Sequence, residues 1–179
     1  MSVRPARPPD AERVARVQLE TWRTAYADLL PPAALDVPEV HVAAGWLNAV
    51  ESPQTPGHRV LVALDGDELV GVAASTPAED DDLEPADAGE LSTVELSTLL
   101  VAPRWGRRGH GARLVAASVE SWRRDGASYA VCWAWQRDPA TRSFLTSAGW
   151  AQDGATRGLD TGERVEHQLR LHTDLREDG

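Results

Sequence analysis

The sequence contains a single cysteine, Cys132, among its 179 residues. One cysteine can form neither an internal disulfide nor a cysteine-based metal cluster. It lies within the apolar run of residues 129–135, where we expect a thiol that packs in the core rather than a nucleophile. The sequence therefore gives little support for covalent catalysis through cysteine, and we predict no metal site.

Long apolar runs are also missing. Nowhere do about 18 consecutive apolar residues occur, which is the length that a membrane-spanning helix needs. The first residues, MSVRPARPPDAERV, lack the apolar core of a signal peptide. We therefore expect a cytoplasmic protein that does not interact with a membrane.

An overall excess of positive charge is missing as well. The formal net charge is −10 at pH 7, which argues against a nucleic-acid partner because such proteins need a basic face. Against this acidic background, Arg104, Arg107, Arg108 and Arg113 form a local basic cluster. A small bound anion at this cluster is compatible with the composition. The acidic run at residues 77–90 is typical of a solvated loop, and less often lines the approach to a site for a cationic substrate.

The length and composition favour one globular domain over residues 1–179, with 42 % hydrophobic and 26 % charged residues. Periodicity and turn signals predict alternating helices and strands, without internal repeats. We expect strands at 2–5, 59–64, 68–75, 96–101, 128–135, 156–159 and 164–171, and helices at 11–27, at 40–50, from 111 and after 138.

Residues 94–122 contain the most informative motif. An apolar strand passes through the turn Gly-Arg-Arg-Gly-His-Gly, residues 106–111, into a helical pattern. Such a turn directs backbone N–H groups and the positive end of the helix dipole at one point, which suits a phosphate. Each charge-assisted hydrogen bond to a phosphate oxygen contributes about 1.5–3 kcal/mol. The alternative is a surface turn in which glycine only serves tight geometry. We expect His110 to be positioned by the turn and not to be catalytic.

With this motif in its centre, nearly the whole chain resembles the GNAT superfamily of N-acetyltransferases, especially its small bacterial members. The resemblance rests on VRPARPPDAERVARVQLETWRTAY, ELSTLLVAPRWGRRGHGARLV, YAVCWAW and RDPATRSFLTSAGW. It implies an α/β (α+β) fold with a mixed, mostly antiparallel sheet of six to seven strands and about four helices. The central strand, at about 93–101, and the next, at about 128–135, should separate in a V-shaped split.

The resemblance also implies acetyl-coenzyme A as the acyl donor. The loop would hold its pyrophosphate, the preceding strand would bind its pantetheine arm, and Asp138 stands where the family has asparagine. The cofactor-binding residues implied in this way are Leu99, Leu100, Val101, Arg107, Arg108, Gly109, His110, Gly111, Ala112 and Asp138. The expected function is N-acetyl transfer to a primary amine of a small molecule or peptide, directly within a ternary complex.

Two departures from the family pattern bear on this function. Gly106 occupies the first loop position, where the family has glutamine or arginine, but backbone donors should still bind phosphate. Leu145 stands where many members have the tyrosine that protonates the leaving thiolate. The alternative function is therefore an acyl-coenzyme A-binding module or sensor with weakened catalysis.

The expected catalytic base is Glu95, by its resemblance to the glutamate of histone-acetylating members. Its alternative is a polar residue on the outward face of the strand. Trp22 and Tyr26, which lie four residues apart on one predicted helix, either line the acceptor pocket or pack in the core. The seven tryptophans leave room for an apolar homodimer surface.

Overall fold

The computed structural model describes residues 1–53, 55, 57–78, 93–162 and 164–176, and most of the acidic run at 77–90 lies outside these residues. The N-terminal half contains β1 (Ser2–Pro5), α1 (Ala11–Ala25), α2 (Pro32–Leu35), α3 (Glu39–Glu51), β2 (Arg59–Asp65) and β3 (Glu68–Pro77). The remainder contains β4 (Thr93–Val101), α4 (His110–Arg124), β5 (Tyr129–Trp135), α5 (Pro139–Ser147), β6 (Ala151–Asp160) and β7 (Val165–Asp174). Short 3-10 turns at Pro8–Asp10 and Pro103–Trp105 precede α1 and the glycine-rich loop.

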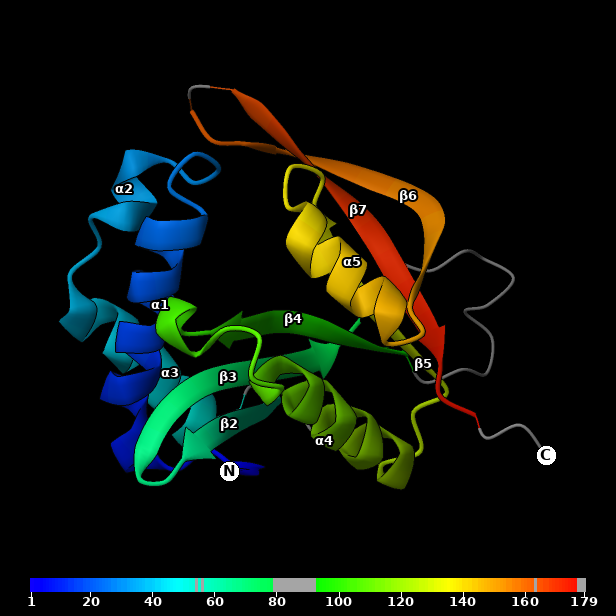
Figure 1. Ribbon diagram of the computed structural model, residues 1–179, viewed down its shortest axis with the longest axis horizontal. Coiled ribbons are helices and arrows are strands. Elements are labelled where there is room, and N and C mark those ends of the chain that lie inside the picture. Colours follow the sequence, from blue (N-terminus) through cyan, green and yellow to red (C-terminus); the bar gives the residue numbers. More distant parts are fainter. Residues whose placement is uncertain (54, 56, 79–92, 163, 177–179) are drawn as a thin grey trace.

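The strands of the described chain form one seven-stranded sheet in the order β1-β2-β3-β4-β5-β7-β6 (Figure 1). Neighbouring strands are antiparallel except for the pair β4 and β5, which is parallel. With the five α-helices of the same residues, this confirms the expected mixed, mostly antiparallel fold.

The expected split in the sheet lies between β4 and β5. These strands pair only from Thr93, opposite Tyr129, to Glu95, opposite Val131. Along its other edge β4 stays paired with β3 as far as Val101. One edge of β4 is therefore open to ligands beyond Glu95, because a strand without a neighbour presents its backbone N–H and C=O groups.

Helices cover both faces of the sheet (Figure 1). On one face α4 and α5 contribute Val115, Trp122 and the fully buried Leu145 to the larger core. On the other face Val14 and Val17 of α1 pack against strand residues that include Val72 and Leu100. Apolar side chains are therefore buried on both faces of the sheet, and such burial is the main stabilising force of a fold.

Two elements differ from the expectations. The segment after α1 contains a short helix, α2, because Pro32 can occupy the first turn of a helix. Strand β6 begins at Ala151, five residues before the expected strand at 156–159, with an irregular register between Gln152 and Thr156. Its polar, mostly exposed residues carry no apolar alternation that could have revealed it.

No helix of the described residues is long and apolar enough to cross a membrane. All seven tryptophans lie within the described residues and are buried or half-buried. They therefore offer no exposed apolar patch for the expected homodimer surface, and dimerisation stays a prediction.

Candidate active site

The glycine-rich loop has the backbone shape of an anion-binding site. Gly109 has a φ of +81° and Arg107 a φ of +59°, which is unusual for a residue with a side chain. Within the described residues, no backbone acceptor takes a hydrogen bond from the N–H groups of residues 107–112. Helix α4 starts directly after Gly109, so its positive dipole end lies at the same place. Free N–H groups and a helix N-terminus together suit a phosphate.

A cavity of about 430 Å³ opens beside this loop and runs along the end of β4. Its lining brings together most of the residues expected to bind the cofactor, namely Leu99, Leu100, Val101, Arg107, Gly109, His110, Gly111 and Ala112. Arg108 instead places its guanidinium 4.8 Å from the centre of the Trp105 ring, a cation–π contact. Phe144 from α5 also lines this cavity, next to Gly111.

His110 is held within the loop, as its sequence position led us to expect. Its side chain is buried as the first residue of α4, and its ring contacts Trp105 edge-on with centroids 5.9 Å apart. The His110 Nε2 and Trp105 Nε1 atoms have no hydrogen-bond partner within the described residues. Their rings therefore shape the wall of the cavity by packing.

A second cavity, of about 230 Å³, occupies the split between β4 and β5. Residues 96–100 of β4 and 132–135 of β5 form its sides. Helix α1 contributes Gln18 and Trp22, and Tyr26 follows directly after the helix. Four aromatic rings line it, from Trp22, Tyr26, Trp133 and Trp135. Asp138, expected among the cofactor-binding residues, lines this second cavity rather than the first. We call the two spaces the loop cavity and the split cavity.

Tyr26, Asp138 and Thr141 form a polar cluster in the split cavity. The Tyr26 hydroxyl lies 3.1 Å from Asp138 Oδ2, and the Thr141 hydroxyl donates to the same oxygen at 2.6 Å. Asp138 also caps α5, since its Oδ1 accepts from the Thr141 N–H at 3.0 Å. Burial, followed by the negative charge of Asp138, raises the pKa of Tyr26 to about 12. The phenol is therefore protonated at neutral pH.

The remaining sequence candidates lie outside this cluster. Glu95 is half-buried in the part of β4 that pairs with β5, and it is not among the described residues that line either cavity. Cys132 lines the split cavity, but burial raises the pKa of its thiol to about 12, so it is not a thiolate at neutral pH. Leu145 is fully buried in the core and offers no proton.

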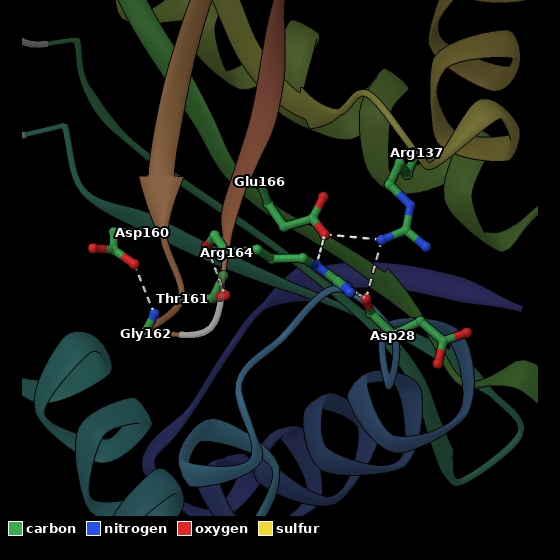
Figure 2. Close-up of polar contacts among 7 residues, drawn as sticks. All are labelled: Asp28, Arg137, Asp160, Thr161, Gly162, Arg164 and Glu166. Carbon is green, nitrogen blue, oxygen red and sulfur yellow. Dashed lines mark hydrogen bonds and ion pairs between the residues drawn. The ribbon is translucent and has the colours of Figure 1, made fainter.

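An ionic cluster lies close in sequence to the residues Leu30, Asp138 and Gln168, which line the split cavity (Figure 2). The carboxylate of Glu166, on β7, is buried and accepts hydrogen bonds from Arg137 at 2.8 Å and from Arg164. Both guanidinium groups also donate to the carbonyl oxygen of Asp28, after α1. Although burial would raise the pKa of Glu166, these arginines outweigh it and lower the pKa. The cluster thus joins the segment after α1, the loop before α5 and β7 in one place.

Several residues that line the split cavity were not predicted from the sequence. Gln18 could have been found, because it precedes Trp22 and Tyr26 at the same helical spacing of four residues. Thr141 and Gln168 could not, since only the packing of α5 and β7 brings them to the split cavity.

Comparison with known proteins places this geometry in a family. Residues 19–150, well over half of the chain, match the acetyltransferase (GNAT) family. The chain is 23 % identical over 157 residues to a protein named probable N-acetyltransferase in Mycobacterium tuberculosis, covering 86 % of this chain and 82 % of that one.

Two solved structures share the fold. PaiA N-acetyltransferase of Thermoplasma acidophilum, in complex with coenzyme A, superposes with a TM-score of 0.72 at 15 % identity, covering 97 % of this chain and 98 % of that one. YncA of Salmonella typhimurium, solved with its cofactor acetyl-CoA, gives a TM-score of 0.73 at 20 % identity, covering 100 % and 96 %. By its sequence match and its fold, the chain belongs to the GNAT family of acetyltransferases.

Proposed function

We propose that this protein moves an acetyl group from acetyl-coenzyme A to the primary amine of a small molecule or peptide. The observation that carries the proposal is that the loop cavity and the split cavity meet at common residues: Tyr26, Leu99, Leu100 and Thr141 line both. An acyl donor held by the loop and an amine held in the split would thus react where the two cavities join, which is the effect of proximity. We further propose that residues 1–179 work as one acetyltransferase domain in the cytoplasm.

The loop cavity suits coenzyme A by its chemistry. When bound, acetyl-coenzyme A supplies an activated acyl group as a thioester. The N–H groups of residues 107–112 and the Arg107 guanidinium would hold the pyrophosphate, and the open edge of β4 would hydrogen-bond the pantetheine arm. Backbone N–H groups on this edge can also polarise the thioester carbonyl.

The split cavity suits a small amine. Its volume of about 230 Å³ lies below the usual range of about 300–1,000 Å³ for ligand pockets, so one compact molecule or one side chain fits. Trp22, Trp133 and Trp135 offer apolar and cation–π contacts, and Asp138 offers a carboxylate for an ammonium group.

Direct transfer is favoured over an acyl-enzyme because the Cys132 thiol is buried and neutral. We keep Glu95 as the proposed base, acting through solvent on the incoming ammonium. It lies four residues before Leu99, or about 13 Å along the strand.

The proposal is tested with acetyl-coenzyme A and a panel of amines, antibiotics and peptides, following the release of free thiol. We expect thiol release that depends on the amine. Double-reciprocal plots of the rate should intersect when both substrates are varied, as for a ternary complex, and the Cys132→Ala variant should stay active. The alternative, a coenzyme A-binding module or sensor, draws on the burial of Leu145, where a proton donor is missing. Tight coenzyme A binding without thiol release for any amine would establish that alternative.

A further inference from the structure

The junction of the two cavities holds hydroxyl groups that the proposed function leaves without a role. Among the described residues that line both cavities, Leu99 and Leu100 have no side-chain proton to give, whereas Tyr26 and Thr141 carry hydroxyls. Both hydroxyls hydrogen-bond to one carboxylate, that of Asp138. Asp138 itself lines the split cavity, where the amine is proposed to bind.

Acetyl transfer to an amine requires that one proton change its place, and the present inference rests on that proposed function. When the neutral amine attacks the thioester carbonyl, a C–N bond forms and the C–S bond breaks, with its electron pair leaving on sulfur. The nitrogen then carries one proton too many. The sulfur, whose thiol has an ordinary pKa of about 8.5, lacks one. A proton acceptor and a proton donor between the two atoms can correct both.

We propose that Asp138 and Tyr26 form a proton relay, in which Asp138 takes the proton from the acceptor nitrogen and Tyr26 gives its hydroxyl proton to the sulfur. The 3.1 Å separation of the Tyr26 hydroxyl and Asp138 Oδ2 lets the protonated carboxyl return a proton to the phenolate. Both residues therefore end each turnover as they began. The relay makes up for the missing donor at Leu145, which lies in the core.

The contacts around Asp138 fit this role. Within the described residues its carboxylate accepts from the Thr141 N–H, the Thr141 hydroxyl and the Tyr26 hydroxyl. A carboxylate accepts about four hydrogen bonds, so one position remains for an amine. The Thr141 hydroxyl, a far weaker acid than a phenol, positions the carboxylate instead of supplying the proton.

Burial and the charge of Asp138 keep the Tyr26 hydroxyl protonated. Burial and the Asp138 charge raise the pKa of Tyr26, and the other titratable group acting on it, Cys132, is a neutral thiol. A phenol that stays protonated in the resting protein has a proton to give. Because a pKa of about 12 also makes the phenol a weak acid, its donation to sulfur depends on the protonated Asp138 carboxyl returning a proton to the phenolate.

The first test compares kcat of full-length Tyr26→Phe and Asp138→Asn with the wild type, using an amine that the wild type acetylates. We expect each variant to lose about tenfold or more in kcat, with the acetyl-coenzyme A Kd nearly unchanged, because a positioned proton donor or acceptor contributes about 10²–10⁴-fold. Because the two residues act as one unit, the double variant should be no slower than the slower single variant. Asparagine also caps helices, so α5 keeps its start.

Tyr129→Phe is the matched control. The sequence contains two tyrosines, and the hydroxyl of Tyr129 contacts Arg176, at 3.2 Å, rather than the lining of either cavity. This variant should keep the wild-type kcat.

The second test needs no turnover. In Tyr129→Phe the only tyrosine is Tyr26, so the ultraviolet absorbance of phenolate reports its titration alone. The midpoint should lie near pH 12, and Asp138→Asn in this background should lower it, since the carboxylate charge is gone while burial stays. An unmoved midpoint would mean that the Asp138 carboxylate does not act on the Tyr26 hydroxyl, as the relay requires.

The outcomes separate the relay from the function on which it rests. Wild-type acetylation with either single variant at the wild-type rate overturns the relay and leaves the proposed function standing. Independent, multiplying losses in the double variant, or an unmoved titration midpoint, overturn it too. Coenzyme A binding by a wild type that acetylates no amine overturns the proposed function, and the relay with it.

Discussion

Replacing Gly109 by alanine tests whether the loop binds phosphate through its backbone shape. The φ of +81° at this position suits glycine, and a residue with a Cβ loses about 1–2 kcal/mol there. The three atoms nearest to the added Cβ all belong to the Arg113 guanidinium, the nearest at an ordinary contact distance of 3.5 Å, so the penalty comes from the backbone and not from a clash.

This penalty should appear mainly as weaker cofactor binding. The loop residues before α4 are largely exposed, so the free variant can relax to a more favourable φ and must return to the strained one to bind. Because about 1.4 kcal/mol corresponds to a tenfold change, the Kd of acetyl-coenzyme A should rise about 5–30-fold. Isothermal titration calorimetry measures this Kd. If the loop of the free variant does not relax, the backbone penalty should instead appear as a lower melting temperature of the free protein.

Gly66→Ala is the matched control for this experiment. Gly66, in the turn between β2 and β3, also has a positive φ of +60°, and no atom lies within 4 Å of the added Cβ. It should lower the thermal stability while leaving the Kd unchanged. An unchanged Kd together with an unchanged melting temperature in Gly109→Ala would refute the role assigned to the loop backbone.

Three further variants test the roles of the carboxylates Glu95, Glu166 and Asp10. Glu95→Gln should lower the rate at neutral pH if Glu95 is the base, and an unchanged pH–rate profile would remove it from the mechanism. Glu166→Gln should lower the free energy of unfolding by about 1–2 kcal/mol, because the two ion pairs are lost while the half-exposed arginines can still be solvated by water. For a chain of this size, calorimetry should show a melting temperature about 2–8 °C lower. Asp10→Asn should destabilise the protein at pH 7, because the hydrogen bond from Arg4 lowers the pKa of Asp10 below its ordinary 3.8. This contribution is present above pH 3.8 and is lost as the pH falls through the folded pKa, so denaturant unfolding of the two proteins should converge in acid; a constant difference would contradict the assignment.

The shape of the glycine-rich loop was predictable because everything that determines it is local. The strand, the basic glycine-rich turn and the helix follow each other in the chain, and their order alone indicated a phosphate site. The hairpin of β2 and β3 was predictable for the same reason, since an Asp-Gly turn joins two apolar runs.

The split cavity was less predictable because it depends on distant contacts. Tyr26 and Asp138 are 112 positions apart, and only the packing of α1 beside the split brings them within hydrogen-bonding distance. The resemblance to the family assigned Asp138 to the cofactor, whereas the structure places it among the residues that line the split cavity. The burial of Leu145, in contrast, was predictable from the local pattern, because it is an apolar residue on the apolar side of a helix.

The separation of β4 from β5 leaves one edge of β4 beyond Glu95 without a neighbouring strand among the described residues. If the pantetheine arm bonds the open edge of β4 beyond Glu95, the ligand takes the place of a strand, and binding becomes part of the folding energy. A ligand at 100 times its Kd stabilises a folded protein by about 2.7 kcal/mol. The amide hydrogens of residues 96–101 that face the open edge should therefore exchange faster in the free protein than in the complex, and the melting temperature should rise with the coenzyme A concentration.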